Sequence, residues 1–148
     1  MARVSDLENL CVLEQTAFAG DRISRRSWKR LIDGTSNVVM LIEYSTELAG
    51  ALVMLYRKGS TAARIYSIAT APSYAGKGLG GHLLSFAKMR ARHDGFTCLR
   101  LETRIDNHRA QTLFRRHGFE AFERKFNYYE DGADALRFHM PLRRPERH

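Results

Sequence analysis

A short glycine-rich stretch has the residue types and the spacing to bind a phosphate group. It consists, in order, of Ala75, Gly76, Lys77, Gly78, Leu79, Gly80 and Gly81. Glycine has no Cβ, so main-chain N–H groups around it can close on a ligand. A helical pattern starts at Leu79, and the first N–H groups of a helix have no partner and lie at its positive end. The stretch therefore predicts a phosphate site, to which Lys77 adds a mobile positive charge.

Two known nucleotide-binding motifs are partly matched by this stretch, but neither motif fits the stretch and its flanking residues. Gly76-x-Gly78-x-x-Gly81, with Glu102 about 20 residues on, has the spacing of a dinucleotide fingerprint. There the first glycine follows the strand directly, whereas here residues 71–75 intervene. The Lys-Ser or Lys-Thr ending of a triphosphate loop is missing, since Leu79 follows Gly78. An ordinary glycine turn remains an alternative.

The elements around the stretch form a strand, a turn and a helix. Residues 64–70 have the composition of a strand, and Pro72 lies in the turn that follows. We expect the apolar stripe of the helix to consist of Leu79, Leu83, Phe86 and Met89 or Arg90, at spacings of three and four.

Two further helices are expected near the N-terminus. Ser5 and Glu8 have the spacing of a capping box, and Gly20 ends the first helix. Ser24 is expected to cap the second helix, which Gly34 ends. The predicted inward side chains are Leu10, Leu13, Ala17 and Phe18 in the first helix, and Trp28, Leu31 and Ile32 in the second.

Strands make up most of the remaining pattern. Short turns join the first three strands, so they should form an antiparallel meander, and the last two should form a hairpin. The order of elements predicts a mixed α/β fold with a mostly antiparallel sheet and helices on both faces. The expected strands are Val38–Tyr44, Leu48–Arg57, Ala63–Thr70, Thr97–Thr103, Phe119–Tyr128 and Ala135–Leu142, and the later helices are Gly78–His93 and Asn107–His117.

Length and composition predict one soluble domain. The 148 residues suffice for one buried core, and the last six residues, 143–148, read as a frayed basic tail. No apolar run is long enough to span a membrane, and Asp6 and Glu8 interrupt any signal-peptide core, so the cytoplasm is expected. Cys11 and Cys98 are too few and too far apart to suggest a disulfide framework or a metal site, and no His pair has metal-ligand spacing backed by a third ligand, so no metal is expected. The net charge of +8 makes a polyanion such as nucleic acid, the ribosome or a phosphorylated cofactor a plausible partner, with simple solubility as the alternative.

Two motifs at this separation resemble those of the GNAT acetyltransferase superfamily over nearly the whole chain. Ala71-Pro72 with Gly76–Gly80 resembles motif A. A second set of residues resembles motif B. It consists of Leu99–Glu102, Asp106-Asn107, Ala110, Leu113-Phe114 and Gly118–Glu120. The end of the chain, at Asn127–Tyr129, Asp134–Leu136 and Met140, is similar to bacterial ribosomal-protein-alanine N-acetyltransferases, as is Ile68-Ala69 before the loop.

The resemblance implies a single-domain fold with a central splay in the sheet and a role for each matching residue. Acetyl-CoA is the implied co-substrate, with its pyrophosphate on the amides of Gly76–Gly81. Main-chain groups of Ile68 and Thr70, on either side of Ala69, would hold the pantetheine arm beside the splay. Asn107 would hydrogen-bond the same arm and cap its own helix. Glu102 stands where the ribosomal-alanine enzymes have their general base.

Three departures from the family pattern affect these expectations. Ala75 replaces the usual Gln or Arg, so one side chain of the loop is lost. Phe114 replaces the usual tyrosine that protonates the leaving thiolate, although its position still belongs to the cofactor site. The usual first strand is short or absent, since only residues 2–4 precede the first helix cap.

The implied reaction transfers an acetyl group from a thioester to a primary amine, by direct attack. An α-amine titrates near pH 7.7–8.0, so a carboxylate acting through one water would suffice as base. Glu102 is the candidate, and a surface ion pair with Arg100 or Arg104 is the alternative. Tyr128 and Tyr129 are candidates for the missing acid, or for contact with the acceptor, or for simple hairpin packing.

The acceptor is expected to be a peptide N-terminus or a small amine. Its pocket should involve the first two helices and the last hairpin. The basic cluster of Arg22, Arg25, Arg26, Lys29 and Arg30 is either a solvated face or a contact for a negatively charged or ribosome-bound acceptor. An acyl-CoA-binding module with little catalysis is the alternative function. A nucleic-acid-binding domain is a third, for which the strands show no aromatic and basic pattern.

Overall fold

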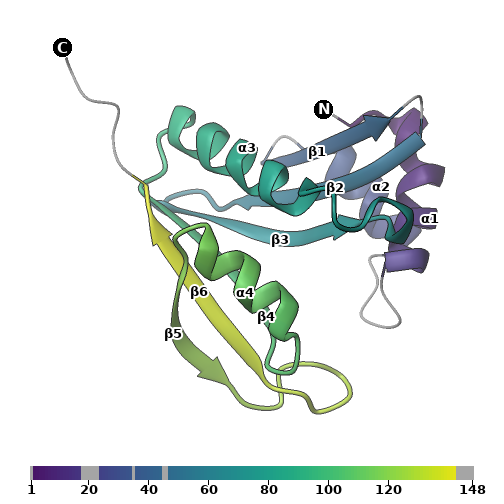
Figure 1. The fold of residues 1–148 in the computed structure, drawn as a ribbon. Coiled ribbons are helices and arrows are strands. Elements are labelled where there is room, and N and C mark those ends of the chain that lie inside the picture. The colour runs from purple at the N-terminus through teal and green to yellow at the C-terminus, as the bar shows by residue number, and fades with distance from the viewer. Residues whose placement is uncertain (1, 18–23, 35, 45–46, 143–148) are drawn as a thin grey trace. The chain divides into compact units, whose positions relative to one another are not determined.

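The computed structural model describes residues 2–17, 24–34, 36–44 and 47–142 (Figure 1). The chain divides into two compact units. Unit 1 comprises Met1–Leu55 and Tyr66–Leu83, and unit 2 comprises Tyr56–Ile65 and Leu84–His148. The expected basic tail, 143–148, lies outside the described residues.

The described elements follow the predicted order. The helices are η1 (Val4–Asp6), α1 (Leu7–Ala17), α2 (Arg25–Asp33), η2 (Pro72–Tyr74), α3 (Leu79–His93) and α4 (His108–Arg116). The strands are β1 (Asn37–Tyr44), β2 (Glu47–Tyr56), β3 (Ala62–Thr70), β4 (Cys98–Arg104), β5 (Glu120–Lys125) and β6 (Ala135–Pro141).

The six strands form one sheet in the order β1-β2-β3-β4-β6-β5. β1 pairs with β2, β4 with β6 and β5 with β6 in antiparallel register, while β3 and β4 are parallel from Ala62↔Cys98 to Ile65↔Leu101. The predicted mixed α/β fold with a mostly antiparallel sheet is confirmed. No strand precedes η1 among the described residues, as expected, although the amide of Ala2 donates a hydrogen bond to the carbonyl of Val39 at 3.1 Å.

Unit 1 encloses an apolar cluster that includes Leu10, Leu13 and Trp28. The N-cap of α2 is confirmed, because the Ser24 hydroxyl accepts the Ser27 amide at 3.1 Å. The capping box predicted at Ser5 is wrong: the chain already turns in η1, where the Arg3 amide donates to the Asp6 carboxylate at 2.7 Å. The predicted helix end at Gly20 and the stripe residue Phe18 lie outside the described residues.

In unit 2, α4 lies over β4 and β6 (Figure 1). The Phe114 ring packs edge-on against Phe119 and Phe138, at centroid distances of 6.1 and 5.8 Å. Gly118, at φ +91°, takes a backbone conformation that other residues rarely adopt, so it can end the helix and lead the chain toward β5.

Two sequence predictions in the second half of the chain are wrong. Phe86 and Met89 are 54% and 61% exposed, because the buried stripe of α3 continues through the small side chains of Ala87 and Ala91. The strand predicted over 119–128 ends at Lys125, since the chain then turns.

Candidate functional site

The glycine-rich stretch forms an open turn at the start of α3, within unit 1. Gly76 and Gly78 have φ angles of +80° and +73°, which L side chains rarely adopt. Apart from the glycine itself and its two chain neighbours, no heavy atom of the described residues lies within 4 Å of the position that a Cβ would take at either glycine. The backbone is therefore accessible to a ligand on the side where other residues carry a side chain.

The main-chain amides of this turn are available to a ligand. Ala75 closes η2 by donating to the carbonyl of Pro72, and His82 donates to the carbonyl of Gly78. Between them, the amides of Gly76–Gly81 have no main-chain hydrogen bond in the described part of the chain, as is expected for the first turn of a helix. Ala75 and Lys77 are exposed, whereas the Leu79 side chain is buried and offers only its amide.

The end of β3 leads directly into this turn. Ala69 is buried, and Ile68 and Thr70 are half-buried. The amide of Ala71 donates to the carbonyl of Ala49 at 2.8 Å, so β3 stays paired up to the turn. Gly50 was missed by the sequence analysis: a Cβ there would lie 3.3 Å from both the Ala69 carbonyl and a Leu83 methyl. The close packing behind the turn is the physical reason for a glycine inside β2.

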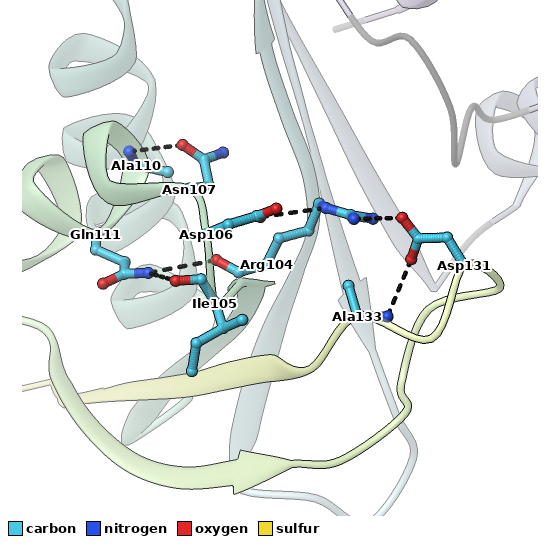
Figure 2. Close-up of polar contacts among 8 residues, drawn as sticks. All are labelled: Arg104, Ile105, Asp106, Asn107, Ala110, Gln111, Asp131 and Ala133. Atoms are coloured by element: carbon cyan, nitrogen blue, oxygen red, sulfur yellow. Dashed lines mark hydrogen bonds and ion pairs between the residues drawn. The ribbon is translucent and has the colours of Figure 1, made fainter.

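Asn107 caps α4 in unit 2, as predicted. Its Oδ1 accepts the Ala110 amide at 3.1 Å, as Figure 2 shows. The Nδ2 group is not needed for the cap, and Asn107 is exposed. One side chain can therefore stabilise the helix start and still present an amide donor to a ligand.

The loop that carries Asn107 is fixed by residues that sequence reasoning missed (Figure 2). The buried Gln111 donates from Nε2 to the carbonyls of Arg104 and Ile105, at 3.3 and 2.9 Å. The Arg104 guanidinium bonds Asp131, and this hydrogen bond raises the pKa of Arg104 above its ordinary value although partial burial opposes it. These contacts hold the β4–α4 loop and the β5–β6 turn together. A polar residue on the inner face of α4 was the only sequence signal for Gln111.

Glu102 lies between two arginines on one face of the unit 2 sheet. Its side chain is 10% exposed; Oε2 accepts from Arg64 Nε at 3.0 Å, and Oε1 lies 3.4 Å from Arg137 Nε. The alternative role of Glu102, an ion pair, was considered with Arg100 or Arg104, whereas the carboxylate pairs with Arg64 and Arg137. The register explains these partners, because Arg137 faces Glu102 across the β4–β6 ladder and Arg64 faces Arg100 across the β3–β4 ladder.

Tyr128 and Tyr129 lie in the β5–β6 turn and contact different cations. The Tyr128 hydroxyl accepts a hydrogen bond from Arg64 Nη2 at 3.1 Å. The Tyr129 ring lies under the Arg104 guanidinium at 5.0 Å and edge-on to Tyr128 at 5.0 Å. Both amides donate to the carbonyl of Ala133. Glu102 and Tyr128 thus both contact Arg64, whereas the Tyr129 ring contacts Arg104.

Phe114 is 3% exposed, and its ring is part of the unit 2 core. A phenyl ring carries no proton to donate, so this position supplies no acid. Among the described residues, no three His, Cys, Asp or Glu side chains gather in a way that would hold a metal ion. The described helices include none long and apolar enough to cross a membrane.

Comparisons with known proteins agree with this geometry. Residues 3–119 match the model of the Acetyltransferase (GNAT) family. A protein of Bacillus subtilis named as a ribosomal-protein-bS18-alanine N-acetyltransferase is 29% identical over 135 residues, which cover 90% of this chain and 88% of that protein. N-alpha-acetyltransferase 30 of Xenopus laevis is 30% identical over 120 residues, covering 79% of this chain and 44% of that protein.

Solved structures show the same fold. The ribosomal-protein-S18-alanine N-acetyltransferase of Escherichia coli superposes with a TM-score of 0.87 at 25% identity, covering 98% of this chain and 93% of that one. The NatC complex bound to Gag peptide and CoA contains a chain with a TM-score of 0.80 at 19% identity, covering 95% and 93%, a likeness of fold alone. The family match, together with an open glycine turn between β3 and α3, shows that this chain belongs to the GNAT family of acetyl-CoA-dependent N-acetyltransferases.

Proposed function

We propose that this chain transfers the acetyl group of acetyl-CoA to the α-amine of a peptide, by direct attack of the amine on the thioester. The observation that carries the proposal is the open turn at Gly76–Gly81, at the start of a 15-residue helix, whose amides make no main-chain hydrogen bond within the described residues. Main-chain amides and the helix dipole favour a diphosphate such as that of CoA. The proposed residues beside the pantetheine arm are Ile68, Ala69, Thr70, Asn107 and Phe114.

The chemistry needs little help from the protein. The neutral amine nitrogen attacks the thioester carbon, the C–S bond breaks, and CoA leaves as a thiolate. An α-amine has a pKa of about 7.7–8.0 and a thiol has a pKa of about 8.5. The neutral amine and the thiolate are therefore both accessible near neutral pH. We assign to Glu102 the proton that the attacking nitrogen loses, passed through one water. A carboxylate with one ion pair on each oxygen still has lone pairs for that water.

Protonation of the leaving thiolate is assigned to Tyr128 or Tyr129, or to solvent, since Phe114 supplies no proton. A general acid contributes about 10²- to 10⁴-fold, so its absence slows the step without preventing it. The turn that carries both tyrosines is well anchored: Asp134 accepts the Asn127 amide at 2.9 Å and bonds Arg124. These contacts lower the pKa of Asp134, so the anchoring carboxylate stays charged at neutral pH.

A peptide acceptor carried by a polyanionic surface such as the ribosome is the finer part of the proposal. The relative from Bacillus subtilis is named for a ribosomal protein, and α2 presents the exposed cations Arg26, Lys29 and Arg30. Arg25 is ion-paired with Glu8 and contributes less. The expected cytoplasmic location belongs to the same proposal. A KM for the acceptor that rises steeply with salt concentration would support contact with a polyanionic surface.

The test is calorimetry with CoA and acetyl-CoA, followed by thiol release with a panel of acceptors. A peptide with a free N-terminal alanine should release thiol, and the same peptide with a blocked N-terminus should not. Binding of acetyl-CoA without release on any acceptor would favour the alternative, a binding module with little catalysis. Turnover on a small amine but not on peptides would overturn the peptide as acceptor.

A further inference from the structure

We propose that Arg64 is a positioning residue, which fixes the Glu102 carboxylate and the Tyr128 hydroxyl relative to each other. This inference rests on the proposed function. Arg64 Nε donates to Glu102 Oε2 at 3.0 Å, and its Nη2 donates to the Tyr128 hydroxyl at 3.1 Å. One guanidinium therefore bonds two groups that lie far apart in the sequence and belong to different elements, β4 and the β5–β6 turn.

The sheet register determines this arrangement. Arg64 pairs with Arg100 in the parallel β3–β4 ladder, and Glu102 is two residues further along β4 on the same face. Such diagonal neighbours lie within reach of a long side chain. The guanidinium is planar and carries five donors in a rigid fork, so it can hold two acceptors at a fixed angle. A lysine has one point charge on a flexible stem and cannot fix both.

The electrostatics keep Arg64 in place as a cation. Burial by itself lowers the pKa of Arg64, but the charge of Glu102 and the hydrogen bonds to Glu102 and Tyr128 outweigh it and raise the pKa. Arg137 occupies the other oxygen of Glu102 and also bonds Glu123 at 2.9 Å. The carboxylate is thus bonded from both sides, and its orientation is fixed by two strands.

The bond to Arg64 also orients the tyrosine. Because the Tyr128 oxygen accepts from Arg64, its own proton points away from the guanidinium and remains available to another acceptor. Carboxylate and hydroxyl are then presented together, one able to take a proton through water and the other able to donate a hydrogen bond. Neither Arg64 nor its pairing with Tyr128 is visible in the motifs that carry the family resemblance.

The experiment compares Arg64→Met, Arg64→Lys and Arg116→Met in acetyl transfer to a free peptide N-terminus. Arg116 is exposed on α4 and controls for the loss of one charge. For Arg64→Met we expect kcat/KM for the peptide to fall about tenfold, the size of one lost hydrogen bond to a charged group. We also expect an altered pH profile of kcat and unchanged affinity for acetyl-CoA. Arg64→Lys should keep the thermal midpoint of the wild type but recover only part of the rate.

A double-mutant cycle separates positioning from stability. Tyr128→Phe should cost little more in the Arg64→Met background than the latter alone, whereas with Arg116→Met the effects should add. Full rate and an unchanged pH profile in folded Arg64→Met would overturn the inference, as would additive effects of Arg64→Met and Tyr128→Phe. If the wild-type chain itself releases no thiol, the proposed function fails instead, and the two failures are distinct.

Discussion

The glycine turn of unit 1 and the Glu102 cluster of unit 2 present different chemical groups. The turn offers main-chain amides, and its only charged side chain, Lys77, is exposed. The cluster is made of side chains alone: Glu102 between Arg64 and Arg137, with Tyr128 beyond Arg64. A main-chain site is damaged by what a substitution adds, whereas a side-chain cluster is damaged by what it removes. The predictions below test this difference.

The largest effect is expected from Gly78→Glu. A side chain at φ +73° is strained, and its carboxylate enters the space where the amides would meet a phosphate. Repulsion at such distances amounts to a few kcal/mol, so the Kd for CoA should rise about 100-fold or more. Calorimetry measures it.

Gly59→Glu is the matched control. Gly59 has φ +82° and is equally open, but it lies in the β2–β3 turn. Both variants carry the same backbone strain and the same added charge. Equal loss of CoA affinity in the two variants would mean that strain, not the phosphate site, explains the effect, and wild-type affinity in Gly78→Glu would remove the turn from the cofactor site.

The next effect is expected from Glu102→Gln, which removes a charge without adding bulk. Loss of a general base lowers the rate by about 10²-fold at the lower end of the usual range. We expect the lower end because the amine of the acceptor is already partly neutral. The kcat should fall by about that factor, with a changed pH profile and an unchanged Kd for acetyl-CoA. Stopped assays over a range of pH and calorimetry provide both readouts.

Glu123→Gln is the control for that variant, because Glu123 also pairs with Arg137 but is more exposed. It should leave kcat near the wild-type value. If the two variants lose the same activity, Glu102 acts only as a partner of Arg137. If Glu102→Gln keeps the wild-type profile, it is not the base.

The two regions also differ in how far the sequence predicts them. The turn was predicted residue by residue, because glycines, Pro72 and a following helical pattern are local signals. The strands and the caps at Ser24 and Asn107 were predicted for the same reason. The partners of Glu102 could not be found in this way: only Arg100 and Arg104 were considered, as part of an alternative role. Arg64 is 38 residues away, and only the parallel register brings it close.

The errors in the helices have a similar origin. Phe86 and Met89 were placed in the buried stripe because large apolar side chains outweigh alanine in a periodicity count. The core instead contains Ala87 and Ala91, and which stripe is buried depends on the shape of what packs against it. At the N-terminus, Ser5 and Glu8 match a capping box, but the hydrogen bond that forms there joins the Arg3 amide to the Asp6 carboxylate. Competing local hydrogen bonds are not resolved by spacing alone.

A smaller effect is expected at Asn107, where main-chain and side-chain roles meet. Asn107→Ser keeps an oxygen for the Ala110 amide but loses the Nδ2 donor, whereas Asn107→Ala loses both. If Nδ2 bonds the pantetheine arm, both variants should raise the Kd for CoA about fivefold, the size of one net hydrogen bond. Only Asn107→Ala should lower the thermal midpoint, by the cost of a lost cap. Wild-type affinity in both variants would restrict Asn107 to capping.

The smallest effect concerns the other end of α3. Asp94 accepts from Tyr56 and from Arg90 at 2.8 Å. Partial burial raises the pKa of Asp94, but those hydrogen bonds and the charge of Arg90 outweigh it, so the pKa is lowered. A lowered pKa means that the ionised form stabilises the fold above the ordinary value of about 3.9, and that this contribution is lost as the pH falls through the lower folded-state value.

Asp94→Asn should therefore lower the free energy of unfolding by about 1 kcal/mol at pH 7, with the deficit shrinking below about pH 4. Urea unfolding at several pH values measures this, and the Kd for CoA should not change. A deficit that persists unchanged at pH 3 would show that Asp94 acts through packing and not through its charge. A weakened CoA affinity would be more instructive, because the phosphate site would then depend on how the far end of its helix is anchored, and the main-chain turn would be less independent of side chains than its geometry indicates.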